Sequence, residues 1–183
     1  VNLSGKVKMG KRNTLQVIAR NADQPNSRWY TGTGIYRPVV LWTADDAHIL
    51  LDGVHVRTLS VDPPEVSVSV RTSCPGKAAI RIMDGDKVLS AQFLQVDTEA
   101  STAFLLPDAA LWQLDAPKMY TCQVIFGTDE HTCTFGIRST EWGQNGFLLN
   151  GQRIILQGAC IHHDNGLLGA CSYPEAEERR VRL

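Results

Sequence analysis

Side chains that can bind a metal ion or a small polar ligand gather near the end of the chain, within twelve residues: Cys160, His162, His163, Asp164 and Cys171. Structural zinc sites use paired ligands with C-x₂₋₄-C or H-x₃₋₅-H spacing, and this group matches no such pattern. We therefore expect no metal ion and no cofactor in this segment. An imidazole also offers a donor and an acceptor to the polar groups of a small ligand, although a loop histidine is most often simply solvated.

The cysteines are five in number and none lies in a C-x-x-C pair. This odd count argues against a disulfide framework or a zinc ribbon. Cys122 and Cys133 fall on the two arms of a predicted hairpin and can therefore lie near each other. Because free cysteine packs as a small hydrophobic residue, we expect two small buried thiols here.

The composition excludes several classes of protein. The chain has 183 residues, is 43% hydrophobic, and carries a formal net charge of −1. A near-neutral chain lacks the basic footprint of a nucleic-acid-binding domain, and no apolar run is long enough to cross a membrane. The length suits one large domain or two small ones, but a complete (β/α)₈ barrel takes about 250 residues.

Alternating apolar and polar residues predict antiparallel strands through the middle of the chain. The alternation is clear in 65–71 and again in 120–126, with a return strand over 133–137. Residues 78–83 and 87–94 read as a hairpin, with Asp-Gly at its turn. Short strands between about 48 and 138 are typical of an Ig-like antiparallel sandwich.

The two flanks do not belong to this sandwich. The first 43 residues contain predicted strands at 14–20 and 34–42, too few to close a sandwich of their own. Their exposed edges are expected to pair, and a second copy of the chain is one candidate partner. After the sandwich, a hairpin over 146–153 with Asn-Gly at its turn leads into a predicted strand at 154–161.

The first convincing helix starts near the end of the chain. Ser172-Tyr173-Pro174-Glu175 has the S-x-x-E form of a capping box, with Pro in the first turn. Glu175 and Arg179, and likewise Glu178 and Arg182, have the spacing of i,i+4 ion pairs. A helix is therefore predicted from about residue 173 onward.

Three separated motifs follow one another along the chain. They are N-S-R-W-Y-T-G-T-G-I-Y-R at 26–37, L-W-Q-L-D-A-P-K-M-Y at 111–120, and a group formed by F-G-I-R at 135–138, G-F-L-L-N-G at 146–151 and Q-G-A-C-I-H-H-D at 157–164. In this order they resemble glycoside hydrolase family 2, which contains β-galactosidases, β-glucuronidases and β-mannosidases. The third group is similar to the start of the catalytic barrel in bacterial β-galactosidase-like members.

The resemblance implies a mainly β chain built from three parts. Residues 1–43 would be the last strands of an incomplete sugar-binding-like jelly-roll domain, and residues 44–138 an Ig-like β-sandwich. Residues 139–183 would be the first strand and helix of the catalytic TIM barrel, also incomplete. The chain is thus expected to be an internal fragment of a longer bacterial enzyme.

The resemblance also implies an activity: retaining hydrolysis of terminal β-glycosides, most readily β-galactosides. Retaining glycosidases use two carboxyl groups, and the family supplies both as glutamates from later barrel strands, beyond residue 183. The glutamates present here match neither motif and are interpreted as surface or helix-terminal charges; they are Glu65, Glu99, Glu130, Glu141 and the group Glu175–Glu178. No catalytic residue is therefore expected in this segment, and the isolated chain is predicted to be inactive.

One part of the sugar pocket is expected in this chain. By resemblance, His162 contacts the sugar from the carboxyl end of the first barrel strand, the face where TIM-barrel active sites lie. His163 and Asp164 are the second choices. Successive side chains of a strand point to opposite sides, so His162 and His163 should not both face the pocket.

Aromatic and basic residues of the first motif could be mistaken for a sugar platform. Arg28, Trp29, Tyr30 and Tyr36 are instead interpreted as packing at the junction of the three parts. Trp112 and Tyr120 are likewise expected in the sandwich core, where the Tyr hydroxyl and the Trp N–H find local partners.

A second hypothesis comes from a different class of protein. The chain could be a free-standing, non-catalytic β-sandwich module that binds carbohydrate or a protein partner, with residues 139–183 packed on the sandwich. Under the first hypothesis the partners are a β-glycoside and the rest of the enzyme, with no nucleic acid and no membrane. The chain begins with Val1 rather than Met, so the compartment, cytoplasmic or periplasmic, stays open.

Overall fold

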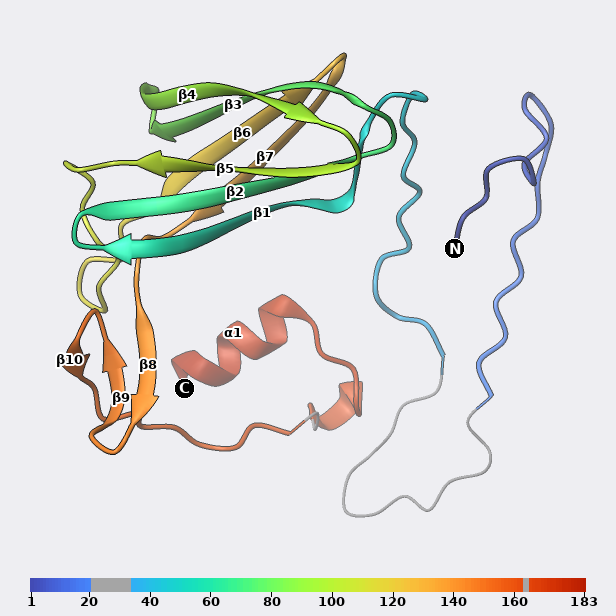
Figure 1. Ribbon diagram of the computed structural model, residues 1–183. Helices are drawn as coiled ribbons and strands as arrows, with labels where there is room; N and C mark the ends of the chain where they lie inside the picture. Colours follow the sequence, from blue (N-terminus) through green and yellow to red (C-terminus); the bar gives the residue numbers. More distant parts are fainter. Residues whose placement is uncertain (21–33, 163–164) are drawn as a thin grey trace. The chain divides into compact units, whose positions relative to one another are not determined.

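The computed structural model describes residues 1–20, 34–162 and 165–183. These residues form two compact units. Leu41–Gln157 make up one unit, and Val1–Val40 together with Gly158–Leu183 make up the other. Within the described residues, all the strands belong to the first unit and the helix α1 belongs to the second (Figure 1).

The larger unit is an antiparallel sandwich of two sheets (Figure 1). One sheet has the strand order β1-β2-β5 and the other has the order β4-β3-β6-β7. The seven strands are β1 (Ile49–Val61), β2 (Pro64–Thr72), β3 (Gly76–Asp84), β4 (Lys87–Val96), β5 (Glu99–Leu105), β6 (Tyr120–Phe126) and β7 (Asp129–Phe135). The expected mainly β, Ig-like sandwich is confirmed.

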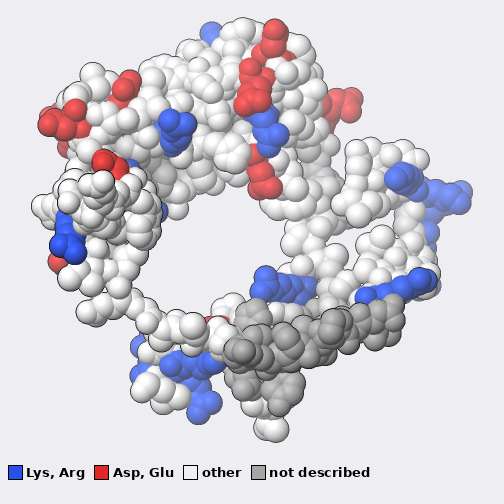
Figure 2. Space-filling view, turned by 60° about the horizontal axis from the view of Figure 1, so that its bottom comes forward, with Lys and Arg blue, Asp and Glu red and all other residues white. Residues whose placement is uncertain are grey.

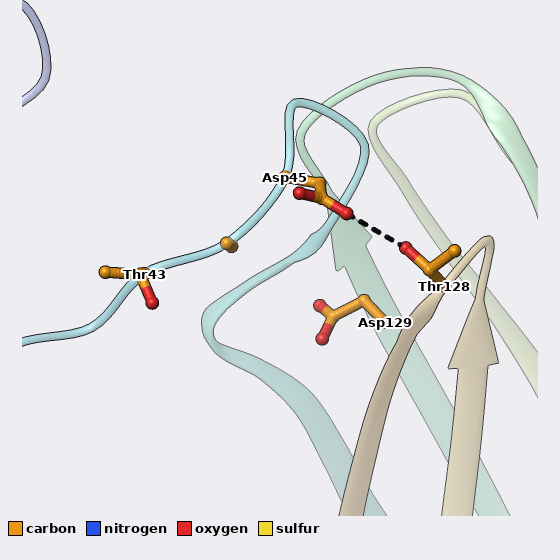
Figure 3. A pocket seen from close by; sticks show the side chains of 5 residues that line it. Thr43, Asp45, Thr128 and Asp129 are labelled. Atoms are coloured by element: carbon orange, nitrogen blue, oxygen red, sulfur yellow. Dashed lines mark hydrogen bonds between the residues drawn. The ribbon is translucent and has the colours of Figure 1, made fainter.

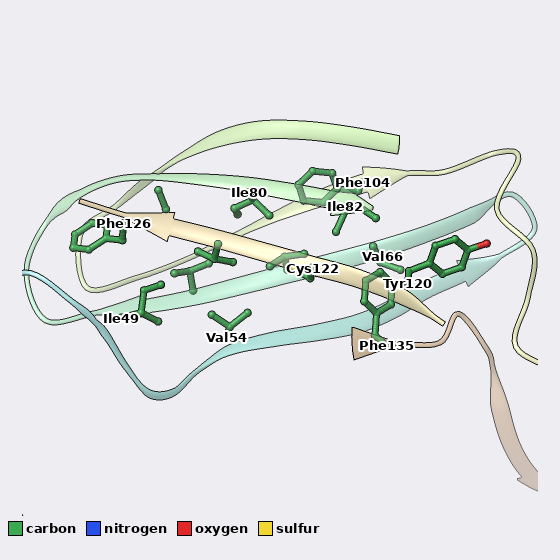
Figure 4. Packing of buried hydrophobic residues seen from close by; sticks show 14 of the residues in the cluster. Ile49, Val54, Val66, Ile80, Ile82, Phe104, Tyr120, Cys122, Phe126 and Phe135 are labelled. Atoms are coloured by element: carbon green, nitrogen blue, oxygen red, sulfur yellow. The ribbon is translucent and has the colours of Figure 1, made fainter. Parts of the chain in front are cut away.

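The sandwich forms where the sequence alternates between apolar and polar residues. In β2, Val66, Val68 and Val70 are fully buried, while the residues between them are only half-buried. β-branched side chains suit a pleated surface with one buried face. The same alternation in β6 buries Cys122 and Val124, so the inner faces of the two sheets supply one continuous core (Figure 4).

Tight turns connect the hairpins as expected. The β3–β4 turn places Gly85 at a φ of 56°, a left-handed conformation that glycine adopts without steric cost. Tyr120, at the start of β6, is buried and its hydroxyl donates a hydrogen bond of 3.1 Å to the Ala110 carbonyl. The expected local partner for this hydroxyl is therefore present.

A small sheet follows the sandwich within the same unit. It has the order β10-β9-β8 and contains β8 (Thr140–Gly143), β9 (Gly146–Leu149) and β10 (Gln152–Arg153). Asn150 and Gly151 both have positive φ at the β9–β10 turn, which confirms the predicted hairpin. The Asn150 side chain accepts a hydrogen bond from the Ser139 N–H and donates one of 2.9 Å to the Trp112 carbonyl, so it joins the small sheet to the sandwich.

Three predicted strands are absent from the structure. Residues 14–20, 34–42 and 154–161 form no strand, so the first 43 residues offer no strand edge among their described part. These segments are rich in apolar residues, but a strand exists only when a neighbouring strand satisfies its backbone N–H and C=O groups. None of these segments takes part in a sheet of the described chain.

The helical part of the smaller unit consists of the 3₁₀ turn Gly166–Leu168 and α1 (Pro174–Arg182). The helix is confirmed, with Pro at its first position, but Tyr173 occupies the N-cap and makes no side-chain cap. The predicted capping box is therefore wrong. The reason is that the Ser172 hydroxyl bonds to the Glu177 carboxylate, at 3.0 Å, instead of a backbone N–H of the first turn.

The surface agrees with the balanced charge of the sequence. Figure 2 shows acidic and basic side chains interspersed over the sandwich on the face in view. Interspersed charges of both signs cancel at a distance, which gives a polyanion no extended basic surface there. Among the described residues, no helix is long and apolar enough to cross a membrane.

Candidate functional site

His162 lies in the smaller unit, on the extended segment that precedes the 3₁₀ turn. Its side chain is exposed. Its backbone carbonyl accepts a hydrogen bond of 3.0 Å from Nη1 of Arg180, which projects from α1. The other two expected site residues, His163 and Asp164, lie outside the described residues.

The loop formed by residues 165–171 is held by the first of them, Asn165. The Asn165 N–H donates to the Gly169 carbonyl at 2.9 Å, which closes the 3₁₀ turn. The Asn165 side-chain amide donates to the Cys171 carbonyl at 2.8 Å and to Oε1 of Glu177 at 2.9 Å. One half-buried amide therefore joins both ends of this loop to the helix.

Two charged side chains of α1 complete this arrangement. Arg180 donates to Oδ1 of Asn165 at 3.1 Å and lies 3.5 Å from the Glu177 carboxylate, one turn away. Glu177 also accepts from the Ser172 hydroxyl. We call Asn165, Ser172, Glu177 and Arg180 the loop network. Charge-assisted hydrogen bonds are stronger than neutral ones, so this network fixes the backbone at His162.

Part of the loop network could not be inferred from the charge pattern. The sequence predicts surface or helix-terminal charges for the glutamates of α1, and Glu178 does form the expected exposed pair with Arg182, at 2.7 Å. Glu175 forms no pair with Arg179 among the described contacts, whereas Glu177 faces the loop. Only the sequence distance between Glu177 and Arg180, one helical turn, hinted at their pairing.

An apolar hollow lies beside the loop network, within the same unit. It has a volume of about 660 Å³, a size typical of small-ligand clefts. Tyr36 and Tyr173 form its aromatic wall, with ring centroids 5.6 Å apart in an edge-to-face arrangement. The Tyr36 hydroxyl accepts a hydrogen bond from the Ser172 N–H at 3.3 Å. Tyr36 thus packs against the start of α1, whereas Arg28, Trp29 and Tyr30 lie outside the described residues.

A second hollow, of about 310 Å³, lies between residues 43–45, which precede β1, and the β6–β7 turn (Figure 3). Its two carboxylates accept hydrogen bonds that stabilise the fold. Asp129 accepts a hydrogen bond of 2.8 Å from the Ile49 N–H, and Asp45 accepts one of 3.2 Å from the Thr128 hydroxyl. In residues 1–20, 34–162 and 165–183, no three His, Cys, Asp or Glu side chains are grouped to hold a metal ion.

The fold defines a class of architecture, the Ig-like antiparallel β-sandwich, and comparison with known proteins shows the family. The sequence profile of the family described as "Glycosyl hydrolases family 2" matches residues 33–138. This match covers more than half of the chain. The chain belongs to glycosyl hydrolases family 2.

Similar proteins come from bacteria. The chain is 30% identical to the β-galactosidase BoGH2A of Bacteroides ovatus over all of its own length, which is 24% of that protein. It is 29% identical to a putative β-glucuronidase of Formosa agariphila, covering 92% of the chain and 17% of that protein. The chain therefore spans about a quarter or less of the length of these curated relatives.

Solved structures show the same fold. A glycosyl hydrolase family 2 member from Bacteroides cellulosilyticus superposes with a TM-score of 0.70 at 34% identity, over 86% of this chain and 23% of that one. A β-glucuronidase of Bifidobacterium dentium superposes with a TM-score of 0.64 at 23% identity, over 75% of this chain and 25% of that one. The second likeness concerns the fold alone.

Proposed function

We propose that this chain is an internal segment of a longer retaining glycosidase that removes terminal β-linked sugars, most readily β-galactosides. In this proposal residues 1–43, 44–138 and 139–183 are the end of a jelly roll, the linking sandwich and the start of the catalytic barrel. The observation that carries the proposal is the alignment of the whole chain with a β-galactosidase, at 30% identity, within a shared family.

The chain would supply one wall of the sugar pocket around His162, with His163 and Asp164 as neighbours. A neutral imidazole donates from one ring nitrogen and accepts at the other, which suits two adjacent sugar hydroxyl groups. Hydrogen bonds to the sugar strengthen as the oxocarbenium-like transition state forms. The exposed side chain of His162 and its anchored backbone support this role.

The sugar is the finer part of the proposal. Relatives include proteins named β-glucuronidase, from Formosa agariphila and Bacteroides fragilis, as well as β-galactosidases. The complete enzyme, assayed with aryl β-galactoside, β-glucuronide and β-mannoside at equal concentration, should hydrolyse the galactoside with the highest kcat/KM. A higher kcat/KM for the glucuronide would show that the enzyme prefers β-glucuronides and would contradict the β-galactoside part of the proposal.

The length of the encoded protein is tested first. The reading frame beyond Leu183 should continue into further strand–helix units that contain an Asn-Glu pair and, later, a second glutamate at a strand end. An immediate stop codon would contradict the proposal and favour a free-standing sandwich module that binds carbohydrate or a protein partner.

The isolated 183-residue chain should not hydrolyse an aryl β-galactoside, because the two carboxyl groups of a retaining mechanism are expected outside it. The measurement is release of the aryl group by purified chain, against a buffer blank. Turnover that persists through purification and disappears in the His162→Ala chain would overturn this expectation.

Arg180→Ala in the complete enzyme should lower kcat/KM about tenfold, which corresponds to about 1.4 kcal/mol. The substitution removes the side chain that donates to the His162 carbonyl and to Asn165, so the backbone at His162 is no longer held to α1. The helix itself should remain, because Ala is a strong helix former. The matched control is Arg182→Ala, whose exposed pair with Glu178 is worth little. Equal losses in both variants would show that Arg180 does not position the loop.

A further inference from the structure

The sandwich contains two cysteines on neighbouring strands that the proposed glycosidase function does not use. Cys122 lies on β6 and Cys133 on β7, and the antiparallel register pairs them directly. Directly opposed residues of antiparallel strands have Cα atoms about 4.5–5.5 Å apart, which lies inside the range of about 4.4–6.8 Å found in disulfides. Both thiols are free in this structure.

The two thiols differ in how solvent reaches them. Cys122 is fully buried on β6, which is flanked by β3 and β7. Cys133 is only half-buried, and β7 is an edge strand of the four-stranded sheet. Cys133 is therefore the more accessible of the two thiols.

The two thiols also differ in acidity. A hydrogen bond from the Cys122 S–H lowers the pKa of Cys133 to about 7, against the opposing effect of burial. The same hydrogen bond, together with burial, raises the pKa of Cys122 above its usual value. The thiolate is the reactive form of cysteine, so the more accessible thiol is also the more reactive one.

We propose that Cys133 and Cys122 form a dithiol site for small disulfides, in which Cys133 is the attacking thiol and Cys122 the resolving thiol. The reactant class is a low-molecular-weight disulfide such as oxidised glutathione. The product is a reversible disulfide between β6 and β7, which ties the edge strand of the sandwich to its neighbour.

The exchange balances in two steps. The Cys133 thiolate attacks one sulfur of glutathione disulfide, forming a mixed disulfide and releasing one glutathione thiolate, which takes up a proton. Cys122 then loses its proton to solvent and attacks the Cys133 sulfur, and the second glutathione leaves. The two cysteines lose two electrons and two protons, and glutathione disulfide gains them as two thiols.

The sequence offers a clean test on the full chain. Trypsin cuts after Lys118 and Arg138 and nowhere between, so one peptide, 119–138, holds Cys122 and Cys133 and no other cysteine. The folded chain is incubated with oxidised glutathione at neutral pH, its free thiols are alkylated in denaturant, and the digest is examined by mass spectrometry. The peptide should be lighter than its reduced form by two hydrogens, carry no alkyl group, and take two after reduction.

Single variants separate the two roles. Cys122→Ser should retain a stable glutathione adduct on Cys133, because no resolving thiol remains. In Cys133→Ser, Cys122 should react at least about tenfold more slowly than Cys133 does, because a buried thiol of raised pKa is a poor nucleophile. Far-UV circular dichroism verifies that each variant is folded, and the wild-type peptide decides the outcome if a variant is not.

The exposed Cys160 serves as an internal indicator that the oxidant is active. The proposal is overturned if peptide 119–138 stays fully alkylated while Cys160 carries glutathione. It is equally overturned if folded Cys133→Ser and Cys122→Ser chains react at the same rate.

Discussion

Phe104→Ala should lower the free energy of unfolding of this chain by about 3–5 kcal/mol, the usual loss for truncating a buried aromatic side chain. Phe104 is fully buried on β5 and lies opposite Val66 of β2. Its ring packs in the core between the two sheets (Figure 4). Backbone hydrogen bonds hold the strands in place, so the sheets can close only part of the cavity that the truncation leaves. Urea denaturation followed by circular dichroism measures the loss.

The matched control is Phe93→Ala. Phe93 lies on β4 and is 70% exposed, and Nζ of Lys77 lies 4.1 Å from the centroid of its ring. Its truncation removes little buried area and one exposed cation–π contact, so the free energy of unfolding should fall by less than about 1 kcal/mol. Similar losses in the two variants would mean that the apolar face between the sheets does not carry the stability of the sandwich.

Phe104 and Phe93 lie on the buried and the exposed side of their strands, and this contrast between the two faces of a strand is what made the sandwich predictable. A strand with one buried face must alternate, so Val66, Val68 and Val70 identify β2 before any partner is known. The turn residues then fix which strands pair, as with Gly85 and the Asn150-Gly151 turn. Local pattern and long-range packing agree in these segments, and such agreement is what makes a fold predictable.

The flanking segments show where pattern alone fails. Residues 34–42 and 154–161 have the apolar content of strands, yet Trp42 is 72% exposed and Ile155 is 77% exposed. Periodicity describes the side chains, whereas a strand is defined by backbone hydrogen bonds to a neighbour. Without such a neighbour in the described chain, the same sequences remain extended and unpaired.

The candidate site was predictable only in part. His162 was identified from a motif, but the contacts that anchor its segment join Asn165 to Glu177 and Arg180 across an irregular loop. No periodicity relates residues of a loop to the face of a helix that follows it. The Pro of the first turn and the i,i+4 charge spacing predicted α1 itself, and only the three-dimensional path of the loop decides which of its glutamates turns inward.

His162→Ala should lower kcat/KM of the complete enzyme on its best aryl β-glycoside by about 10²-fold, equivalent to about 2.7 kcal/mol. The reason is that an interaction with the sugar that strengthens in the transition state is lost, so most of the change should appear in kcat rather than KM. Steady-state kinetics over a range of substrate concentrations separates the two parameters.

Two further variants distinguish a sugar contact from a general effect of removing an imidazole. His55→Ala removes an exposed histidine from β1 of the sandwich and should leave kcat/KM unchanged. His162→Asn keeps a donor and an acceptor on a shorter side chain and should recover part of the lost kcat. If His162→Ala retains full activity while Arg180→Ala does not, the loop network positions some other group of the pocket, and His162 is not the residue that contacts the sugar.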